Sequence, residues 1–118
     1  MRTLTQTPNI DVETLNAAHA FVERIGSRYA LANAILFGSR ARLDHQLTSD
    51  ADIAIILHGH VGKFVATKME MNDIAYEVLL ETGIRIQPFP VWEDEWEHPE
   101  TYPNPRLLQN IEREGVLL

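Results

Sequence analysis

The sequence predicts a small α/β protein in which helices and strands alternate around one sheet. Its 118 residues suit a single domain over 1–118, and a chain of this length buries enough surface to hold a core. The composition, 45% hydrophobic and 23% charged, is ordinary for a globular domain. Along the chain, segments with the 3.6-residue repeat of helices alternate with short apolar runs typical of buried strands.

The first half of the chain contains a helix, a strand and a short helical turn. A helix over residues 11–25 is predicted by the spacings of three and four between its apolar residues, which are Val12, Leu15, Ala18, Val22 and Ile25. Asp11, or Asn9 just before it, can cap the free N–H groups at its start. A short apolar run at 34–37, closed by Gly38, predicts a buried strand. Residues 40–42 then form a first helical turn that leads into a polar loop.

The second half repeats this pattern with two strands around a long helix. An isoleucine-rich run predicts a strand over 51–57, and the helical period returns over 64–81. The next strand is predicted over 84–89, where Pro88 and Pro90 indicate an edge position or an early end. Strands and helices therefore interleave as expected for one sheet covered by helices.

An acidic segment with two tryptophans, residues 91–103, follows the last predicted strand. Trp92 and Trp96 are four residues apart, so on a helix they share one face. Two interpretations are open: the indoles cover the core, or they contact a basic partner protein. A C-terminal helix is predicted to begin after Asn104 and to end at Gly115.

The charge and hydropathy of the chain limit its partners and location. Ten Lys and Arg against 17 Asp and Glu give a net charge of −7, which argues against nucleic-acid binding because such binding relies on cations at phosphates. The longest apolar run, residues 53–57, is far shorter than the ~20 residues that cross a bilayer, and the first ten residues lack the apolar centre of a secretory signal. With no cysteine, a cytoplasmic protein without a membrane segment is expected.

Two short motifs carry the chemistry. Gly38 permits a close backbone approach, and Ser39 adds a hydroxyl at a helical turn whose first N–H groups can bind the phosphates of a nucleoside triphosphate. Asp50 and Asp52 are two residues apart, so on a strand their carboxylates project from one face. Two close carboxylates favour a divalent cation, and Mg²⁺ commonly shares such ligands with substrate phosphates. The pattern predicts a metal–triphosphate site.

Gly38-Ser39, ten intervening residues and Asp50-x-Asp52 resemble the signature of the DNA polymerase β-type nucleotidyltransferase superfamily. The chain is most similar to the minimal nucleotidyltransferases (MNT), small proteins often encoded beside a HEPN-domain partner as toxin–antitoxin pairs. The likeness extends from the first helix to the acidic segment and the C-terminal tail.

This resemblance implies a small mixed sheet flanked by helices, the palm-like nucleotidyltransferase fold. It also implies that Gly38 and Ser39 hold the phosphates of ATP and that Asp50 and Asp52 hold Mg²⁺ and serve catalysis. Arg40 or Arg42, in the turn after the glycine, would reach phosphate oxygens. The expected reaction is transfer of AMP to a hydroxyl of a cognate HEPN toxin.

The sequence departs from the family pattern at two places. Leu43 stands where many members have a glycine. Full catalysts also carry a third carboxylate on the neighbouring strand, and if Ile84 and Ile86 face the core, that position falls to Arg85 or Gln87. Without a third acid, an alternative function stays open: a noncatalytic antitoxin that neutralises the toxin by forming a complex with it.

Two other pairs of titratable residues are weaker candidates. His58 and His60 flank a glycine and are interpreted as part of a solvated turn, because no further ligands accompany them. Asp73 and Glu77 are interpreted as surface acids of the long helix, with the alternative that one of them replaces the missing third carboxylate.

Overall fold

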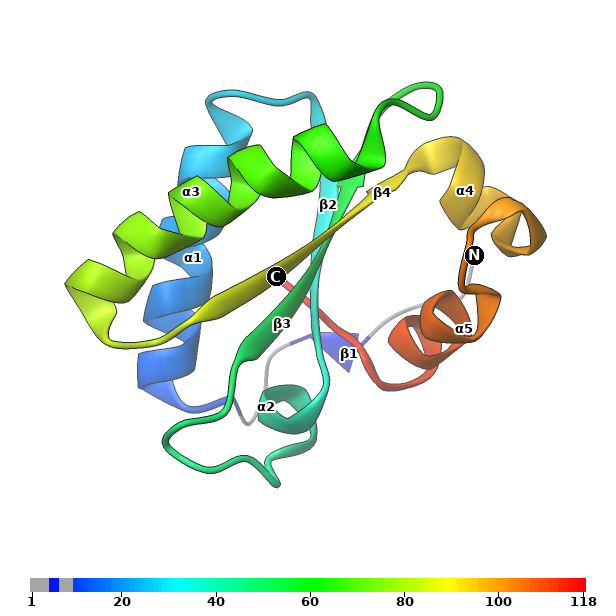
Figure 1. Ribbon diagram of the computed structural model, residues 1–118. Coiled ribbons are helices and arrows are strands. Elements are labelled where there is room, and N and C mark those ends of the chain that lie inside the picture. The colour runs from blue at the N-terminus through cyan, green and yellow to red at the C-terminus, as the bar shows by residue number, and fades with distance from the viewer. Residues whose placement is uncertain (1–4, 7–9) are drawn as a thin grey trace.

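The computed structural model describes residues 5–6 and 10–118 and contains a mixed sheet with strand order β1-β5-β2-β3-β4 among these residues (Figure 1). The strands are β1 (Thr5–Gln6), β2 (Leu31–Phe37), β3 (Ala51–Leu57), β4 (Ile86–Trp92) and β5 (Val116–Leu117). β2 runs antiparallel to both β3 and β5, whereas β3 and β4 are parallel. The predicted mixed α/β fold is confirmed.

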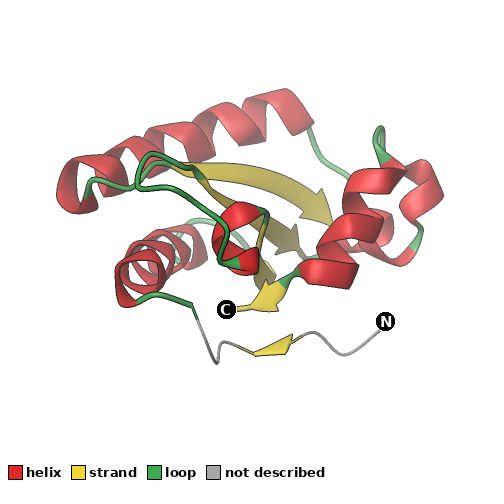
Figure 2. Ribbon diagram, turned by 90° about the horizontal axis from the view of Figure 1, so that it is seen from below, coloured by secondary structure: helices red, strands yellow, loops and turns green. Residues whose placement is uncertain are grey.

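Helices cover both faces of this sheet. They are α1 (Val12–Gly26), α2 (Ser39–Arg42), α3 (Phe64–Thr82), α4 (Glu93–Glu97), the 3₁₀ turn η1 (Pro99–Thr101) and α5 (Pro105–Glu114). α1 and α3 pack together on one face, and α4 and α5 lie on the other (Figure 1). α2 lies at the end of the sheet where β2 stops, as the view from below shows (Figure 2).

β3 is an inner strand of the sheet, and residues 53–57 within it form an unbroken apolar run. Successive side chains of a strand point to opposite faces. Ile53 and Ile55 therefore enter the core beneath α1 and α3, while Ala54 and Ile56 enter the core beneath α4 and α5. A strand that is buried on both faces has apolar side chains on both, so its sequence does not alternate between apolar and polar residues.

The helix ends follow local chemistry. Of the two predicted caps, Asp11 caps α1, because its carboxylate accepts a 3.0 Å hydrogen bond from the backbone N–H of Thr14, and Asn9 lies outside the described residues. Val12, which the repeat assigned to the apolar side, is instead 70% exposed. α3 ends at Gly83, whose φ of +78° is the left-handed conformation expected after a helix.

The strands differ in extent from the sequence prediction. β2 begins three residues earlier than expected, at Leu31, and β4 runs from Ile86 to Trp92 rather than over 84–89. Pro88 and Pro90 do not end β4, because β4 is an outer strand that pairs with β3 alone. The two-residue strands β1 and β5 were not predicted.

The tryptophans belong to the two cores. Trp92 ends β4 and packs in the core beneath α1 and α3, whereas Trp96 lies in α4 and packs in the core on the other face. Both are buried, so the hypothesis that they form a shared contact face for a partner is wrong and the interpretation as core residues holds. A spacing of four residues places two side chains on one face only within a helix, and here Trp96 lies in α4 whereas Trp92 lies in β4.

Within residues 10–118 and the described pair 5–6, no helix is both long enough and apolar enough to cross a membrane.

Candidate functional site

The site begins where β2 ends against the start of β3. Phe37 pairs with Asp52 in the antiparallel register, so Gly38, the next residue, lies against the Asp52 side chain. Gly38 has a φ of +76°, and a Cβ at this position would lie 2.4 Å from Oδ2 of Asp52. Only glycine fits this conformation and this space. The two sequence motifs are therefore in direct contact.

α2 presents the start of a helix beside this contact. Gly38 precedes the helix, and its carbonyl accepts hydrogen bonds from the N–H groups of Ala41 and Arg42 at 3.1 and 3.0 Å. The earlier N–H groups of a helix have no partners within the helix and can bind an anion. Ser39, the first residue of α2, is half-buried at the same place.

The carboxyl group of Asp52 has a raised pKa. Burial raises its pKa to about 6, and repulsion from Asp50 acts in the same direction, while Arg42 and Lys68 oppose the shift. Asp50 immediately precedes β3 rather than lying in it, and its side chain is 44% exposed. The pair thus combines one half-buried and one exposed carboxylate, with excess negative charge between them.

The neighbouring strand supplies no third acid. In the parallel register Asp52 pairs with Gln87, so this amide lies beside Asp52 on the same face of the sheet. Arg85 is mostly exposed and its Nε lies 3.9 Å from Oδ1 of Asp50. Among the residues that the structure describes, no cluster of three or more His, Cys, Asp or Glu side chains could hold a metal ion.

Arg40 requires a correction, because its guanidinium is buried away from the nucleotide position. It donates to Oγ1 of Thr14 at 2.8 Å and to the carbonyls of Ser49 and Leu47 at 3.0 and 3.2 Å. The Thr14 hydroxyl donates in turn to the Asp11 carboxylate at 2.8 Å. Arg40 therefore ties the loop between the motifs to the start of α1 and is not available to phosphate.

Arg42 is the arginine that stays near the carboxylate pair. Its side chain is half-exposed and pairs with Glu114 at 2.8 Å and with Asp44 at 3.2 Å. These two acids raise the pKa of its guanidinium, so Arg42 carries a permanent charge. Since that charge also lowers the pKa of Asp52, Arg42 is close enough to act on an anion at the site.

Lys68 is a site residue that the sequence reasoning missed. From α3 its ammonium reaches around the outer edge of β4, donates to the Pro88 carbonyl at 2.5 Å and lies 4.7 Å from the centre of the Phe89 ring. Burial lowers the pKa of Lys68, and Asp52 opposes this. The available signal is a lysine within the apolar stripe of a helix, where its aliphatic stem packs and its ammonium extends beyond.

The remaining candidates lie outside this site. His58 and His60 pair with Glu93 and Asp94 at 3.0 and 2.7 Å, which agrees with a solvated turn. Asp73 and Glu77 are exposed on α3, and Glu77 lies 3.9 Å from Arg24.

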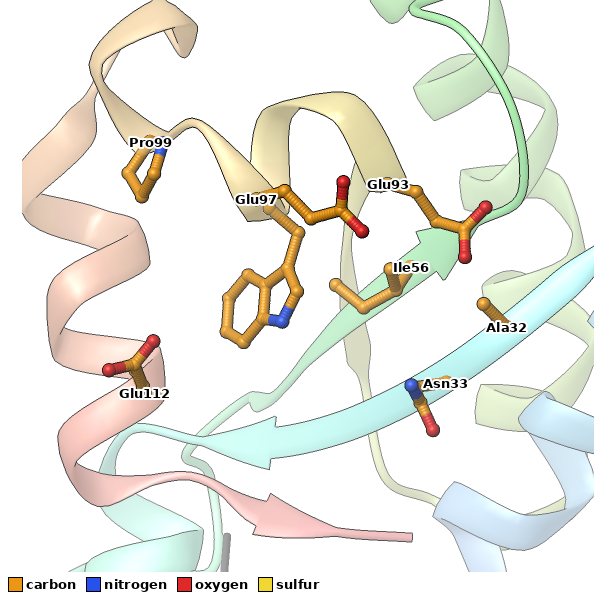
Figure 3. Close-up of a pocket in the computed structure, with 8 residues that line it drawn as sticks. Ala32, Asn33, Ile56, Glu93, Glu97, Pro99 and Glu112 are labelled. Carbon is orange, nitrogen blue, oxygen red and sulfur yellow. The ribbon is translucent and has the colours of Figure 1, made fainter. Parts of the chain in front are cut away.

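Two cavities flank the sheet without enclosing the carboxylate pair. The larger, about 660 Å³, lies at the opposite end of β2 and β3 and is lined by Trp96 and three glutamates (Figure 3). The three are Glu93, Glu97 and Glu112. The smaller, about 240 Å³, lies between α3 and the start of β4 and is lined by Arg85 and Gln87 among others. The second cavity therefore borders the candidate site.

Residues 19–116, which contain both motif strands, match the family described as nucleotidyltransferase domain. The chain belongs to this nucleotidyltransferase family. A crystal structure of a Sulfolobus solfataricus protein, provisionally described as a nucleotidyltransferase, has the same fold with a TM-score of 0.53 and 21% identity, over 94% of this chain and 90% of that chain. That likeness concerns the fold alone. No curated protein sequence matches the chain.

A divalent cation fits this nucleotidyltransferase site. Burial is the largest cause of the rise of the Asp52 pKa to about 6, and the neighbouring Asp50 carboxylate adds to it, so a bound cation would offset both effects. Mg²⁺ is usually bound by one or two carboxylates together with substrate phosphates, and it does not need a third protein ligand. Asp50 and Asp52 are the residues that would hold it.

Proposed function

We propose that this nucleotidyltransferase-family protein transfers AMP from ATP to a hydroxyl group of a HEPN-domain toxin and so acts as its antitoxin. One observation carries the transferase part of the proposal: the Gly38 backbone packs directly on the Asp52 carboxylate. This contact supports the proposal because it brings the turn proposed to bind phosphate next to a carboxylate proposed to bind metal. The toxin partner rests on the resemblance of the motifs to the minimal nucleotidyltransferases.

Each residue of the site has a role in this reaction. The backbone at Gly38 and Ser39 binds the terminal phosphates of ATP, and Arg42 adds a cation beside them. Asp50 and Asp52 would hold Mg²⁺, which would neutralise phosphate charge and orient the α-phosphate. The acceptor oxygen forms a bond to the α-phosphorus while the bond to pyrophosphate breaks, with the two oxygens in line, and the hydroxyl proton passes to solvent.

Gln87 limits the rate of the transfer. Its side chain lies beside Asp52, where it can orient an acceptor hydroxyl, but a neutral amide does not take up the hydroxyl proton. General-base catalysis typically contributes ~10²–10⁴-fold, so a carboxylate here should accelerate the reaction. We expect Gln87→Glu to increase the rate of AMP transfer at least tenfold, measured with α-labelled ATP, while Gln87→Ala does not. Equal rates for wild type and Gln87→Glu would contradict this role.

The absence of a carboxylate at Gln87 also favours a second function. Gln87 lies on the strand that carries the third acid in full catalysts and Arg85 immediately precedes it, and no metal-binding cluster of three acids occurs among the described residues. A protein that has lost catalysis can still bind its toxin and block it. In this alternative, the chain is a noncatalytic antitoxin that neutralises the HEPN ribonuclease by complex formation.

One experiment separates the two functions. The purified protein is incubated with α-labelled ATP, Mg²⁺ and the protein encoded by the adjacent gene, with Asp50→Asn as the control. Label on the partner that disappears in the control supports the transferase. Absence of label, with a stable complex between the two proteins, supports the noncatalytic antitoxin. Absence of both label and complex rejects the toxin partner.

A further inference from the structure

The outer side of α3 carries a stripe of large apolar side chains that nothing in the described monomer covers. Val65, Met69, Tyr76 and Leu80 are 68%, 62%, 59% and 70% exposed. Because each residue turns a helix by about 100°, these four positions fall within an arc of about 60°. They form a seam along α3 of two apolar pairs, with the exposed polar residues Asn72 and Asp73 between them.

This seam is separate from the face that holds α3 to the protein. The buried residues of α3 are Met71, Ile74, Ala75 and Val78. They lie on the opposite side of the helix, where they enter the core shared with α1. The monomer therefore does not need the four exposed side chains for its core, and a contiguous exposed apolar surface of this kind marks an interaction site.

We propose that the seam binds the same seam of a second copy of this chain, with the two α3 helices antiparallel about a two-fold axis. The spacing of the seam is symmetric about its middle, between Asn72 and Asp73. An antiparallel pairing therefore places Val65 against Leu80 of the second copy, and Met69 against Tyr76 of the second copy. A two-fold interface requires this self-complementarity. Methionine sulfur against an aromatic ring is also a favourable contact.

The polar centre of the seam fits the same arrangement. Asn72 and Asp73 are both exposed, and the pairing brings the Asn72 amide level with the Asp73 carboxylate of the second copy. The amide N–H can donate to that carboxylate on each side of the axis. A polar residue in the middle of an apolar seam fixes the register of two helices. The two Asp73 carboxylates lie near each other, so association strengthens with rising ionic strength.

The available area defines the strength of this dimer. Four side chains that are each more than half exposed offer an apolar area on the order of 400 Å², about half of what one partner buries in a standard interface of ~800 Å² per side. The flanking polar residues of the helix supply part of the rest. We therefore expect a weak dimer that dissociates on dilution.

The dimer borders the candidate site. Asn72 and Tyr76 of the seam also line the cavity of about 240 Å³ that contains Arg85 and Gln87. A second copy docked on α3 would close the outer side of this cavity. This inference does not depend on the proposed function, since self-association is measured without nucleotide or toxin.

Sedimentation velocity over a wide concentration range tests the proposal. The wild type is expected to form a dimer as concentration rises, and Leu80→Glu is expected to remain monomeric under the same conditions. Val12→Glu is the matched control, because Val12 is equally exposed but lies on α1. Asp73→Asn is expected to strengthen the dimer, and circular dichroism of each variant checks that it is folded.

The absence of cysteine allows the orientation to be measured by disulfide trapping. Asn72→Cys lies close to the axis and is expected to crosslink to itself under oxidation. Val65→Cys alone is not expected to crosslink, because the two copies of this residue would be about 22 Å apart along the helices. The double variant Val65→Cys/Leu80→Cys is expected to crosslink.

Three results would overturn the proposal. These are a wild type that is monomeric at every concentration, a dimer that persists in Leu80→Glu, and efficient self-crosslinking of Val65→Cys alone. A monomeric chain whose Leu80→Glu variant loses complex formation with the adjacent gene's product would also overturn it, and would assign the seam to that protein.

Discussion

The two arginines of α2 show how position decides the role of a residue. Arg40 and Arg42 are separated by one residue, yet the first is buried in contacts with the loop 44–50 and with α1, and the second stays half-exposed near Asp52. A buried guanidinium satisfies the backbone carbonyls around it. An exposed one near the site is free to gain contacts from an anion.

Substitution of each arginine by methionine should separate stability from binding. Arg40→Met leaves two loop carbonyls and the Thr14 hydroxyl without their donor, so we expect a loss of about 2–3 kcal/mol in the free energy of unfolding. Arg42→Met should leave the urea midpoint nearly unchanged and weaken Mg²⁺-dependent ATP binding at least fivefold. Urea denaturation and calorimetry measure the two effects. A loss of ATP binding in Arg40→Met together with a loss of stability in Arg42→Met would contradict these roles.

Asp52 should make the nucleotide-free protein less stable as pH rises. Its pKa of about 6 in the folded state lies above the ordinary value of 3.8, so the folded protein holds this proton more tightly than the unfolded chain. The resulting stabilisation is complete below pH ~4 and is lost as pH rises through ~6.

Asp52→Asn removes this ionisation. Because the carboxylate is only half-buried and solvent screens it, we expect the variant to be more stable than wild type at pH 7 by about 1 kcal/mol, with little difference at pH 4. The same variant should lose Mg²⁺-dependent ATP affinity. Urea denaturation at both pH values, with Asp44→Asn as a surface control, checks the stability effect. A less stable Asp52→Asn at pH 7 would contradict it.

Individual elements were predictable where one periodic signal dominated. The long helix α3 and the strand β3 follow from their repeat and their apolar run, and the contact between Gly38 and Asp52 follows from two motifs on neighbouring strands. β1 and β5 were missed because two-residue strands exist only through pairing with distant parts of the chain.

The errors at the site have a similar cause. Sequence spacing places Arg40 and Arg42 in one turn but does not show which of them the loop will cover. Lys68 was missed because its role arises from the position of α3 against the outer edge of β4, which no local pattern encodes. Packing between distant parts of the chain therefore determines the roles of the two arginines and of Lys68.

The end of α2 offers a test of local backbone strain. Leu43 follows the helix with a φ of +64°, a left-handed conformation that favours glycine. Leu43→Gly removes strain of about 1 kcal/mol, partly offset by the greater freedom of glycine in the unfolded chain. We expect a net gain of about 0.5 kcal/mol in urea denaturation. Leu43→Ala, which keeps the strain, should not show the gain.

The whole molecule is one sheet between two cores, and this arrangement should unfold as a unit. Trp92 reports on the core beneath α1 and α3, and Trp96 reports on the core beneath α4 and α5. Both cores share β2, β3 and β4, so neither should survive without the other.

Single-tryptophan variants measure this cooperativity. In Trp96→Phe the fluorescence comes from Trp92, and in Trp92→Phe it comes from Trp96. We expect the fluorescence transition of each variant in urea to coincide with its own transition by circular dichroism. Different midpoints for the two probes within one variant would mean that the two faces unfold separately and that the chain is not a single cooperative domain.

β4 also limits how the protein substrate of the proposed reaction could approach. It is the outer strand on its side of the sheet, two of its seven residues are prolines, and Lys68 occupies the carbonyl of Pro88. Prolines offer no N–H group to an added strand, and a bonded lysine blocks an acceptor. If the acceptor of the proposed reaction is a polypeptide, it is therefore not expected to dock by extending the sheet at this edge. Its hydroxyl would have to reach the site without adding a strand to β4.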